Sequence, residues 1–254
     1  MEIITEVKDG ILRIQMNRPE KKNALTVAMY AEMATAFEQA ERDSAIRVVL
    51  IHGCSDVFTS GNDLQDFMKN PPAGEESPVF KFLVAISTAA KPVIAAVNGP
   101  AVGIGVTMLL HCDLVYAAET TRFQLPFVNL ALVPEAGSSL LLPNLIGYRR
   151  AAELLLLGEA FSAVKAHEYG LISEVTGDGE ELAAAMATAK KLAGKPPAAL
   201  RLTKMLMKKN GADLVARHMG EEAVHFVRQL QSPEAQEAFK AFQEKRPPDY
   251  SKFN

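Results

Sequence analysis

Three short apolar runs constrain the fold of this chain more than any other feature. They are RVVLIHG (47–53), KPVIAAVNG (91–99) and DLVYAA (113–118), and the first two end in glycine. Apolar runs of this length, bounded by turn residues, are typical of buried strands. Strand-like runs alternate with helical patterns in this part of the chain, so the chain is predicted to form an α/β fold.

The N-terminal part adds a hairpin and a helix to this prediction. Residues 3–7 and 11–16 alternate apolar and polar side chains, and Asp9-Gly10 between them suits a tight turn. Thr26 is a good N-cap residue, which predicts a helix from there to about Asp43. Its apolar stripe would be Tyr30, Ala34, Phe37 and Ala40.

From Ser138 onward the chain shows helical spacing and no strand pattern. Examples are AAELLLLG (151–158), SAVKAHEYG (162–170) and GEELAAAMATAKKLAG (179–194). We therefore expect an α/β core over residues 1–195 and a helical region over residues 196–254. Within that region, MLMKKN (205–210) is predicted to be one face of a packed helix with a solvated basic end.

Composition excludes several functional classes. The 254 residues are 48% hydrophobic and 22% charged, as in ordinary globular proteins, with a net charge of −3 and no basic stripe for nucleic acid. The apolar runs are too short to span a membrane. Cys54 and Cys112 form no CxxC pair or Cys/His cluster, so no metal site or disulfide framework is expected. The N-terminus resembles neither a secretory nor a transit signal, and a cytoplasmic location is expected.

Two glycine loops could hold free backbone amides. In SGNDL (60–64) the glycine lets the chain turn into a helix, with Asn62 or Asp63 as an ordinary cap in the simplest interpretation. In NGPAVGIGVTMLLHCD (98–113) three glycines follow a buried strand and precede an apolar helix. The spacing does not match the GxGxxG dinucleotide motif. Amides aimed at negative charge and close helix–strand packing are both open explanations.

The third segment, NLALVPEAGSSLL (129–141), sets one acid among apolar neighbours. If Glu135 is buried there, its pKa rises toward neutrality and it can take and return a proton. The alternative is a helix-entry glutamate that faces water. Ser138 is expected to cap the helix that follows.

The ordered set of motifs resembles one enzyme superfamily over nearly the whole chain. The motifs are FTSGNDL (58–64), KPVIAAVNGPAVGIG (91–105), CDLVYA (112–117), LVPEAGSS (132–139) and FQEKRPP (242–248). They resemble the crotonase, or enoyl-CoA hydratase/isomerase, superfamily, and most of all its Δ3,Δ2-enoyl-CoA isomerases. The resemblance implies a crotonase-type spiral of ββα repeats with a C-terminal helical trimerisation region. It also implies an acyl-CoA thioester substrate, a homotrimer or dimer of trimers, and no cofactor or metal.

The resemblance also implies roles for individual residues. The N–H groups of Asn62, after Gly61, and Ile104, after Gly103, would hold the thioester oxygen. Hydratases of this superfamily carry two glutamates, and the matching positions here are Thr107 and Phe127. The isomerases use one acid at the position of Glu135, which would act as the catalytic base.

Further residues are expected to bind the substrate. The loop RPEKKNAL (18–25) matches the family's loop near the nucleotide, so Lys21 or Lys22 could meet phosphate. Lys240, Lys245 and Arg246 could also reach a CoA. The full expected binding set is Lys22, Ala24, Leu25, Ser60, Gly61, Asp63, Leu64, Gly103, Thr107, Phe127 and Pro134.

The implied activity is the conversion of 3-enoyl-CoA to trans-2-enoyl-CoA by a 1,3-proton shift on one glutamate. Addition of water is disfavoured, because both hydratase positions hold side chains that cannot ionise. Three alternatives remain: an enoyl-CoA hydratase, a ring isomerase acting on aromatic acyl-CoA, and a non-catalytic acyl-CoA binder.

Overall fold

A computed structural model describes residues 1–71, 74 and 76–253, and its centre is a six-stranded sheet. The strand order is β1 (Ile3–Lys8), β2 (Ile11–Met16), β3 (Val48–His52), β4 (Val93–Val97), β6 (Leu114–Ala118) and β9 (Glu174–Thr176). Only β1 and β2 pair antiparallel, as the predicted hairpin, and the other neighbours are parallel. Every residue of β3 and β4 is buried, which confirms the prediction from their apolar runs.

A second, smaller sheet gives the fold its spiral. It contains β5 (Pro100–Val102), β7 (Arg122–Gln124) and β8 (Phe161–Ser162). After β3, β4 and β6 the chain passes in turn through Thr59, β5 and β7, and Thr59 forms a parallel bridge to Ala101 of β5. Each turn of the chain therefore contributes one strand to the large sheet and then a strand, or at Thr59 a single bridge, to the small one before a helical segment follows, which is the expected ββα repeat.

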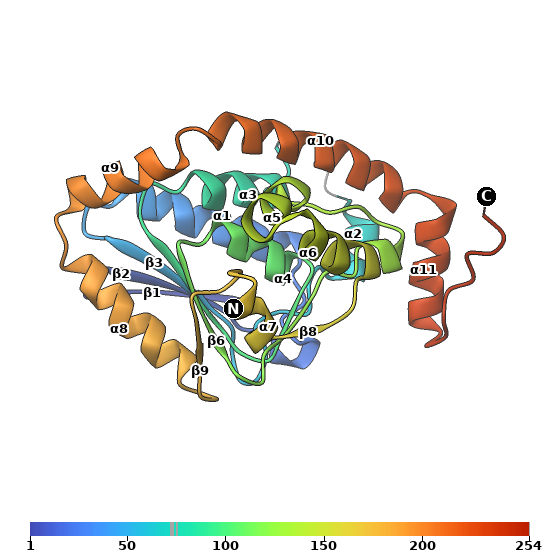
Figure 1. The fold of residues 1–254 in the computed structure, drawn as a ribbon, viewed down its shortest axis with the longest axis horizontal. Coiled ribbons are helices and arrows are strands. Elements are labelled where there is room, and N and C mark those ends of the chain that lie inside the picture. Colours follow the sequence, from blue (N-terminus) through green and yellow to red (C-terminus); the bar gives the residue numbers. More distant parts are fainter. Residues whose placement is uncertain (72–73, 75, 254) are drawn as a thin grey trace.

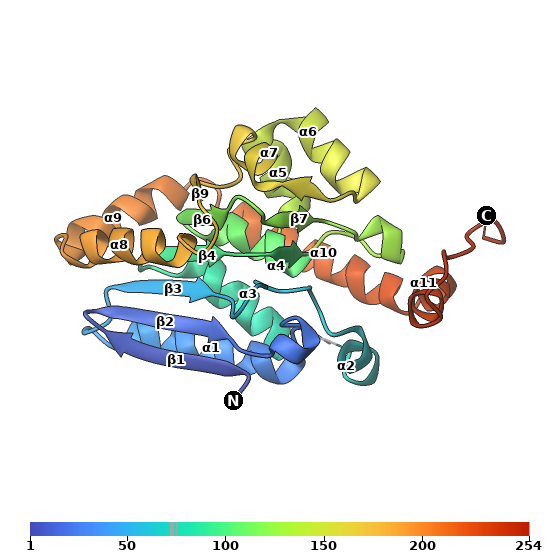
Figure 2. The ribbon, with the colours of Figure 1, turned by 90° about the horizontal axis from the view of Figure 1, so that it is seen from below.

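Helices cover both faces of the large sheet (Figure 1; Figure 2). On one face α1 (Val27–Arg42) packs beside α3 (Pro78–Thr88) over the main core, while α8 (Glu181–Ala193) covers the opposite face with Ala185 and Ala189. The predicted stripe of α1 is fully within the core, and the Thr26 hydroxyl accepts the Met29 N–H at 3.2 Å as the expected N-cap.

Short helical segments lie between the strands and the longer helices. They are η1 (Pro19–Lys21), α2 (Leu64–Lys69), α4 (Ile104–Thr107), η2 (Met108–His111), η3 (Val128–Leu130), α5 (Ser138–Ile146), α6 (Tyr148–Ala152), the π-helical turn η4 (Glu153–Leu157) and α7 (Ala163–Glu168). The apolar helix expected after the second glycine loop is thus only four residues of α-helix, which continues as a 3-10 turn.

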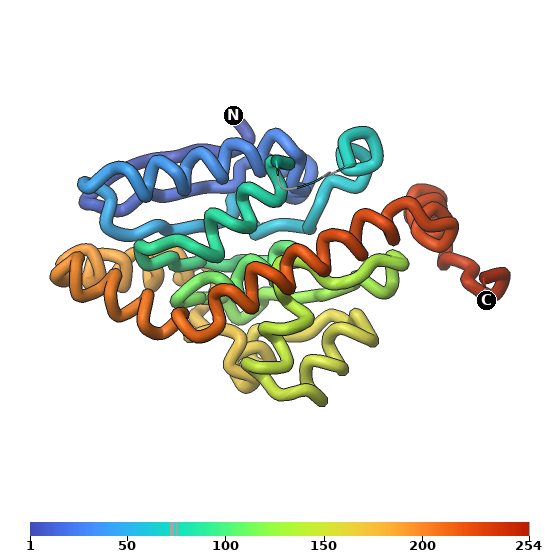
Figure 3. The backbone as a smooth tube through the Cα atoms, turned by 90° about the horizontal axis from the view of Figure 1, so that it is seen from above, coloured from blue at the N-terminus to red at the C-terminus, as the bar shows by residue number. Residues whose placement is uncertain are grey.

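The chain ends in three helices, α9 (Pro197–Lys208), α10 (Ala212–Leu230) and α11 (Pro233–Gln243). Figures 1 and 3 show that α10 crosses the molecule between α3 and α5 and brings α11 to the far end. The helical region proposed for residues 196–254 stays a prediction as a separate unit. Among the described residues, no helix is both long enough and apolar enough to cross a membrane.

The prediction of helices alone after Ser138 is wrong, because β8 and β9 lie in that part of the chain. Both strands are only two or three residues long, and β9 is polar at its first position. Strands this short leave no period-2 pattern to detect. The tertiary pairing of β9 with β6 and of β8 with β7 defines them instead.

Candidate active site

A cleft of about 1200 Å³ opens where the loops after β3 and β5 face the C-terminal helices. Its walls bring together most of the residues expected to bind or transform a substrate. They are Lys21, Lys22, Ala24, Ser60, Gly61, Asn62, Asp63, Leu64, Gly103, Ile104, Phe127 and Glu135. The opposite wall consists largely of apolar residues of α10 and α11: Phe226, Leu230, Phe239 and Phe242.

The first glycine loop leaves an amide free at this cleft. Gly61 has φ +95°, and a Cβ there would lie 3.1 Å from the Val102 carbonyl oxygen, so the position suits glycine alone. Leu25 donates its N–H to the Gly61 oxygen and accepts the Asp63 N–H, both at 2.8 Å. Asn62 lies between these bonds, and its own N–H donates to no acceptor among the described residues.

The second glycine loop also leaves a backbone amide free at the cleft, and it packs tightly against a neighbouring loop. Gly103 has φ +55°, and its N–H donates to the Gln124 oxygen at 2.9 Å. The next N–H, that of Ile104, has no acceptor in the described part of the chain. A Cβ on Gly105 would lie 2.6 Å from Thr59 Cγ2. Close packing therefore explains Gly105, whereas Gly103 precedes an amide that is free to donate, and binding of negative charge there stays a prediction.

Glu135 is buried in the cleft, at 6% exposure, rather than facing water. Its Oε1 has no hydrogen-bond partner among the described residues. Burial raises the pKa of Glu135 to about 8, with a further contribution from the charge of Glu222, whereas a hydrogen bond from Asn62 opposes the rise. The pKa of Glu135 is thus raised, as expected from its apolar surroundings.

The side chain of Asn62 links Glu135 to the core. The buried Tyr30 hydroxyl donates to Asn62 Oδ1 at 2.5 Å, which orients the amide and leaves its NH₂ group for the Glu135 carboxyl. Burial and the nearby Glu135 charge raise the pKa of Tyr30 well above its usual value, so the phenol stays protonated as a donor. The sequence offered the Asn62 side chain only as a possible helix cap, a role that Asp63 takes, and it placed Tyr30 in the apolar stripe of a helix rather than in the site.

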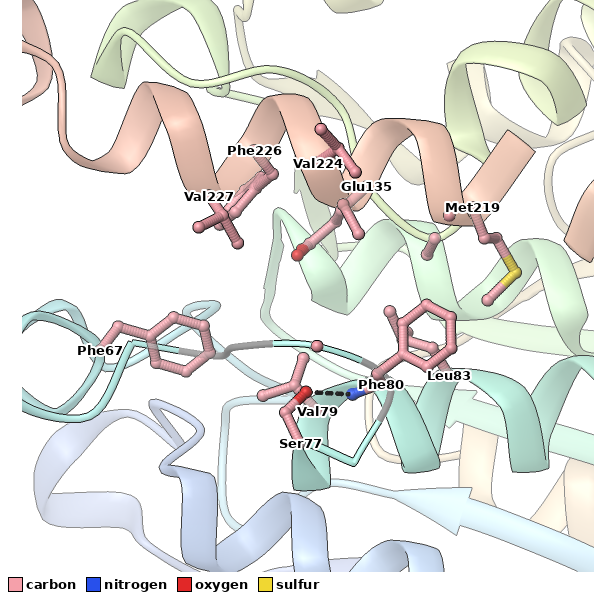
Figure 4. Close-up of a pocket in the computed structure, with 14 residues that line it drawn as sticks. Phe67, Ser77, Val79, Phe80, Leu83, Glu135, Met219, Val224, Phe226 and Val227 are labelled. Atoms are coloured by element: carbon pink, nitrogen blue, oxygen red, sulfur yellow. Dashed lines mark hydrogen bonds between the residues drawn. The ribbon is translucent and has the colours of Figure 1, made fainter. Parts of the chain in front are cut away.

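A second space, of about 420 Å³, adjoins Glu135 on its other side. Figure 4 shows the carboxyl group pointing into this chamber, which lies between α10 on one side and side chains of α2 and α3 on the other. The lining is almost entirely apolar: Phe67, Val79, Phe80, Leu83, Ala136, Met219, Ala223, Val224, Phe226 and Val227. Such a chamber suits a hydrocarbon chain, and among the described residues that line it Glu135 is the only one with a charged group.

The structure does not bring every predicted residue to the cleft. Leu25 is fully buried beneath the first loop, where its backbone fixes Gly61 and Asp63. Thr107 is fully buried on α4, and its hydroxyl has no partner among the described residues. Pro134 does not line the cleft and lies next to Glu135 in the chain.

Some of the basic residues expected to bind CoA line the cleft and others do not. Lys21, Lys22 and Lys245 line the cleft. Lys240 lies in a neighbouring groove, and Arg246 pairs with Glu237 and Glu244 at 2.6 Å each. Arg246 is thus occupied within the chain rather than open to a ligand.

The expected cap by Ser138 is wrong. Gly137 is the N-cap residue of α5, and the Ser138 hydroxyl is buried without a partner among the described residues. The acceptor at this helix start is the carboxylate of Glu222, on α10. No pattern in the sequence indicates a contact between residues that lie 83 positions apart. Within the described ranges, no three His, Cys, Asp or Glu side chains gather as a metal site would require.

Comparison with known proteins agrees with this geometry. The family model for enoyl-CoA hydratase/isomerase matches residues 6–253. The chain belongs to this family.

Relatives within the family differ in activity. Enoyl-CoA delta isomerase 2 of Homo sapiens is 38% identical over 82% of this chain, although this chain spans only 54% of that protein's length. The 1,2-epoxyphenylacetyl-CoA isomerase of Escherichia coli is 34% identical, with 98% of each chain covered.

A solved enoyl-CoA hydratase/isomerase from Pseudoalteromonas atlantica is similar in fold, at a TM-score of 0.93 and 40% identity, covering 98% of this chain and 99% of that one. The family's crotonase fold is therefore the fold of this chain.

Proposed function

We propose that the protein is a Δ3,Δ2-enoyl-CoA isomerase with Glu135 as its catalytic base. The observation that carries this proposal is a single buried carboxyl group with a free oxygen, in the same cleft as two free backbone amides. Asp63, the other acid in the cleft wall, is occupied by Arg18 at 2.8 Å and by the first N–H groups of α2.

In the proposed reaction, the ionised Glu135 removes a proton from C2 of a 3-enoyl-CoA. The electron pair moves into the thioester and the C3–C4 double bond, which gives a dienolate. The N–H groups of Asn62 and Ile104 donate to the dienolate oxygen, and each such donor contributes roughly 3–4 kcal/mol in comparable sites. Glu135 then returns the proton to C4, and the product is trans-2-enoyl-CoA.

Two residues support isomerisation over hydration. Hydration of the 2-enoyl product needs carboxyl groups that hold and deliver water, and the matching positions are Thr107 and Phe127. Phe127 lines the cleft and Thr107 is buried beneath it, so neither can activate water as a base. Excluding water favours return of the proton to carbon.

Different parts of the pocket would bind different parts of the substrate. The hydrocarbon tail occupies the apolar chamber beyond Glu135, and the CoA arm follows Ala24 toward Lys22. The reaction requires no cofactor and no metal, since one carboxyl group carries the proton in both steps. A homotrimer or dimer of trimers is the proposed assembly.

The test is a direct comparison of two reactions. Trans-3-hexenoyl-CoA should isomerise faster than crotonyl-CoA is hydrated, and Glu135→Gln should lower isomerisation by at least about 100-fold while CoA-ester binding survives. Glu221→Gln, an equal change at an exposed position on α10, is the control. Faster hydration than isomerisation would make the protein a hydratase, and unchanged turnover in Glu135→Gln would remove Glu135 from the mechanism.

A second candidate is an isomerase of ring-derived acyl-CoA. It is favoured by the full-length similarity to 1,2-epoxyphenylacetyl-CoA isomerase and by Phe67, Phe80 and Phe226 in the chamber wall, which could stack on a ring. Turnover of 1,2-epoxyphenylacetyl-CoA with a higher kcat/KM than trans-3-hexenoyl-CoA would select this candidate. Absence of turnover with either substrate would leave a binding protein.

A further inference from the structure

Glu222 is a buried acid that the proposed chemistry does not use. It lies on α10, at 6% exposure, with its carboxylate at the start of α5. Oε2 accepts the Gly137 N–H at 2.6 Å. Oε1 accepts both the Ser139 N–H at 2.9 Å and the Ser139 hydroxyl at 2.5 Å. One side chain thus satisfies three donors on a helix that is distant in sequence.

These bonds fall on the turn that carries Glu135. Ala136 and Gly137 both have left-handed backbones, with φ of 60° and 73°, a conformation that alanine avoids. Glycine adopts this conformation freely, but Ala136 needs outside contacts to hold it. Glu222 binds the end of the turn, and His111 Nε2 bonds to the Ala136 oxygen at 2.7 Å on its other side.

The helix after the turn has no cap of its own. Its N-cap residue is glycine, and the first N–H groups of a helix need acceptors from elsewhere. α10 packs directly on this point, since a Cβ on Gly137 would lie 3.3 Å from Met219 Cγ. The orientation of the Glu135 side chain therefore depends on a carboxylate supplied by α10.

Resting on the proposed function, we propose that Glu222 is a positioning residue for the base. Its carboxylate caps α5 and holds the turn at Glu135–Gly137, so that the Glu135 carboxyl group points into the cleft. Its negative charge also makes Glu135 a stronger base. Glu222 touches no reacting atom and acts only through Glu135.

The charged groups around Glu135 make Glu222 the main electrostatic influence. From α1, Tyr30 is a protonated phenol, and from η2, burial lowers the pKa of His111 to about 4, so that its ring is neutral. From α10, His218 Nε2 lies 2.8 Å from the Ser139 hydroxyl and 3.8 Å from Glu222. α2 and α3 present apolar residues to the chamber: Phe67, Val79, Phe80 and Leu83.

The discriminating variants are Glu222→Gln and Glu222→Asp, with Glu221→Gln as the matched control on the same helix. Gln removes the charge and places an NH₂ group against an N–H donor. We expect kcat to fall about 10-fold or more with KM within about 2-fold, since a misplaced group costs rate rather than binding. We expect the midpoint of the acid limb of kcat/KM to move about one unit lower, because a like charge has been removed.

Glu222→Asp separates positioning from charge. It keeps the negative charge but is one methylene too short to reach both N–H groups, so kcat should fall while the pH midpoint stays closer to wild type. Wild-type kcat in both variants, or a pH midpoint in Glu222→Gln equal to that in Glu221→Gln, would overturn the proposal.

A readout without turnover keeps the two proposals apart. The carboxyl carbon of Glu135, labelled with carbon-13 and assigned by its loss in Glu135→Gln, should titrate near 8 in the wild type. It should titrate lower in Glu222→Gln. This shift without any isomerase activity would refute the proposed function alone. If the enzyme is active but the Glu135 titration in Glu222→Gln equals that of the wild type, the role of Glu222 alone is refuted. If the variants fail to fold, the wild type still gives a test: a Glu135 midpoint near 4 would show that the charge of Glu222 does not raise the pKa of Glu135.

Discussion

At the scale of single residues, the site depends on a conflict between burial and charge. Glu135 is surrounded by apolar groups, and among the described residues Asn62 alone stabilises its ionised form, so burial raises the pKa of Glu135 to about 8. A base that holds its proton weakly would be ionised at pH 7 but would be a poor acceptor. A raised pKa makes Glu135 suited both to remove a proton from carbon and to return it.

The first prediction is a pH profile for the wild-type enzyme. kcat/KM reports the free enzyme, and only the ionised form of Glu135 can begin the reaction. With the Glu135 pKa at about 8, kcat/KM should rise with pH, about tenfold per unit well below the midpoint, and level off above 8. Initial rates with trans-3-hexenoyl-CoA between pH 5.5 and 9.5 measure this. A profile already flat from pH 5.5 upward would contradict it.

The second prediction concerns stability. The folded-state pKa of Glu135 is raised from 4.5 to about 8, so the folded protein binds more protons than the unfolded chain between these values. Glu135 therefore lowers the free energy of unfolding as pH rises through this window. Glu135→Gln removes the cost of burying an ionised carboxylate. The free energy of unfolding of this variant minus that of the wild type should therefore increase by about 1–3 kcal/mol from pH 5 to pH 8.5.

Urea unfolding at the two pH values measures this difference. Glu221→Gln, which changes an exposed carboxyl group, should keep a constant difference from wild type. An equal gap for Glu135→Gln at both pH values would show that the carboxyl group is not destabilised by burial.

Much of the site at this scale could be predicted from sequence. The motif order placed Gly61, Asn62, Ile104 and Glu135 together, because the ordered set of motifs could be matched to a family although each motif alone has an ordinary structural explanation. Tyr30 and Glu222 could not be found, because each acts through a contact across the fold. Tyr30 simply matches the apolar stripe of a helix, and Glu222 matches the polar face of another.

At the scale of elements, α10 decides the shape of the tail chamber. Small side chains on its inner face, Gly220 and Ala223, leave room opposite α3. Larger side chains here would fill the space next to Glu135 without touching the glycine loops. The length of chain that the enzyme accepts is therefore expected to depend on this face of α10.

The third prediction tests the chamber with Ala223→Phe. The ring should occupy the space of a long hydrocarbon tail, so kcat/KM for trans-3-dodecenoyl-CoA should fall about 10-fold or more relative to trans-3-hexenoyl-CoA. Ala216→Phe is the control, since Ala216 lies exposed on the same helix away from the chamber. Equal losses for both chain lengths would place the tail elsewhere.

Elements were predictable where the pattern is long. The buried strands, α1 and the helices from α8 onward follow from apolar runs or helical periodicity that extend over five or more residues. The strands β5, β7, β8 and β9 are two or three residues each, and only their partners in space make them strands. The second sheet was expected only through the family resemblance.

At the scale of the whole molecule, α9 leaves most of its large apolar side chains uncovered by the described residues. Leu202, Met205, Leu206 and Met207 are between 49% and 72% exposed, and Lys204 is the only buried residue of the helix. The sequence predicted a packed face for this segment, and within one chain that prediction is wrong. A cluster of exposed apolar side chains is typical of a surface that another protein covers. The trimer implied by the family resemblance would supply that cover.

The last prediction follows from this exposure. Leu206→Glu with Met207→Glu places two charges on the α9 surface, and burying them in an interface without partners is strongly unfavourable. Light scattering after gel filtration should give about three or six times the chain mass for the wild type and a smaller assembly for the double variant. Val7→Glu on β1, 44% exposed, is the control and should keep the wild-type mass.

Since the cleft wall includes α10 and α11, which follow α9 directly, we expect loss of assembly to lower kcat/KM as well. A wild-type that is monomeric, or a double variant with unchanged mass, would remove α9 from the assembly.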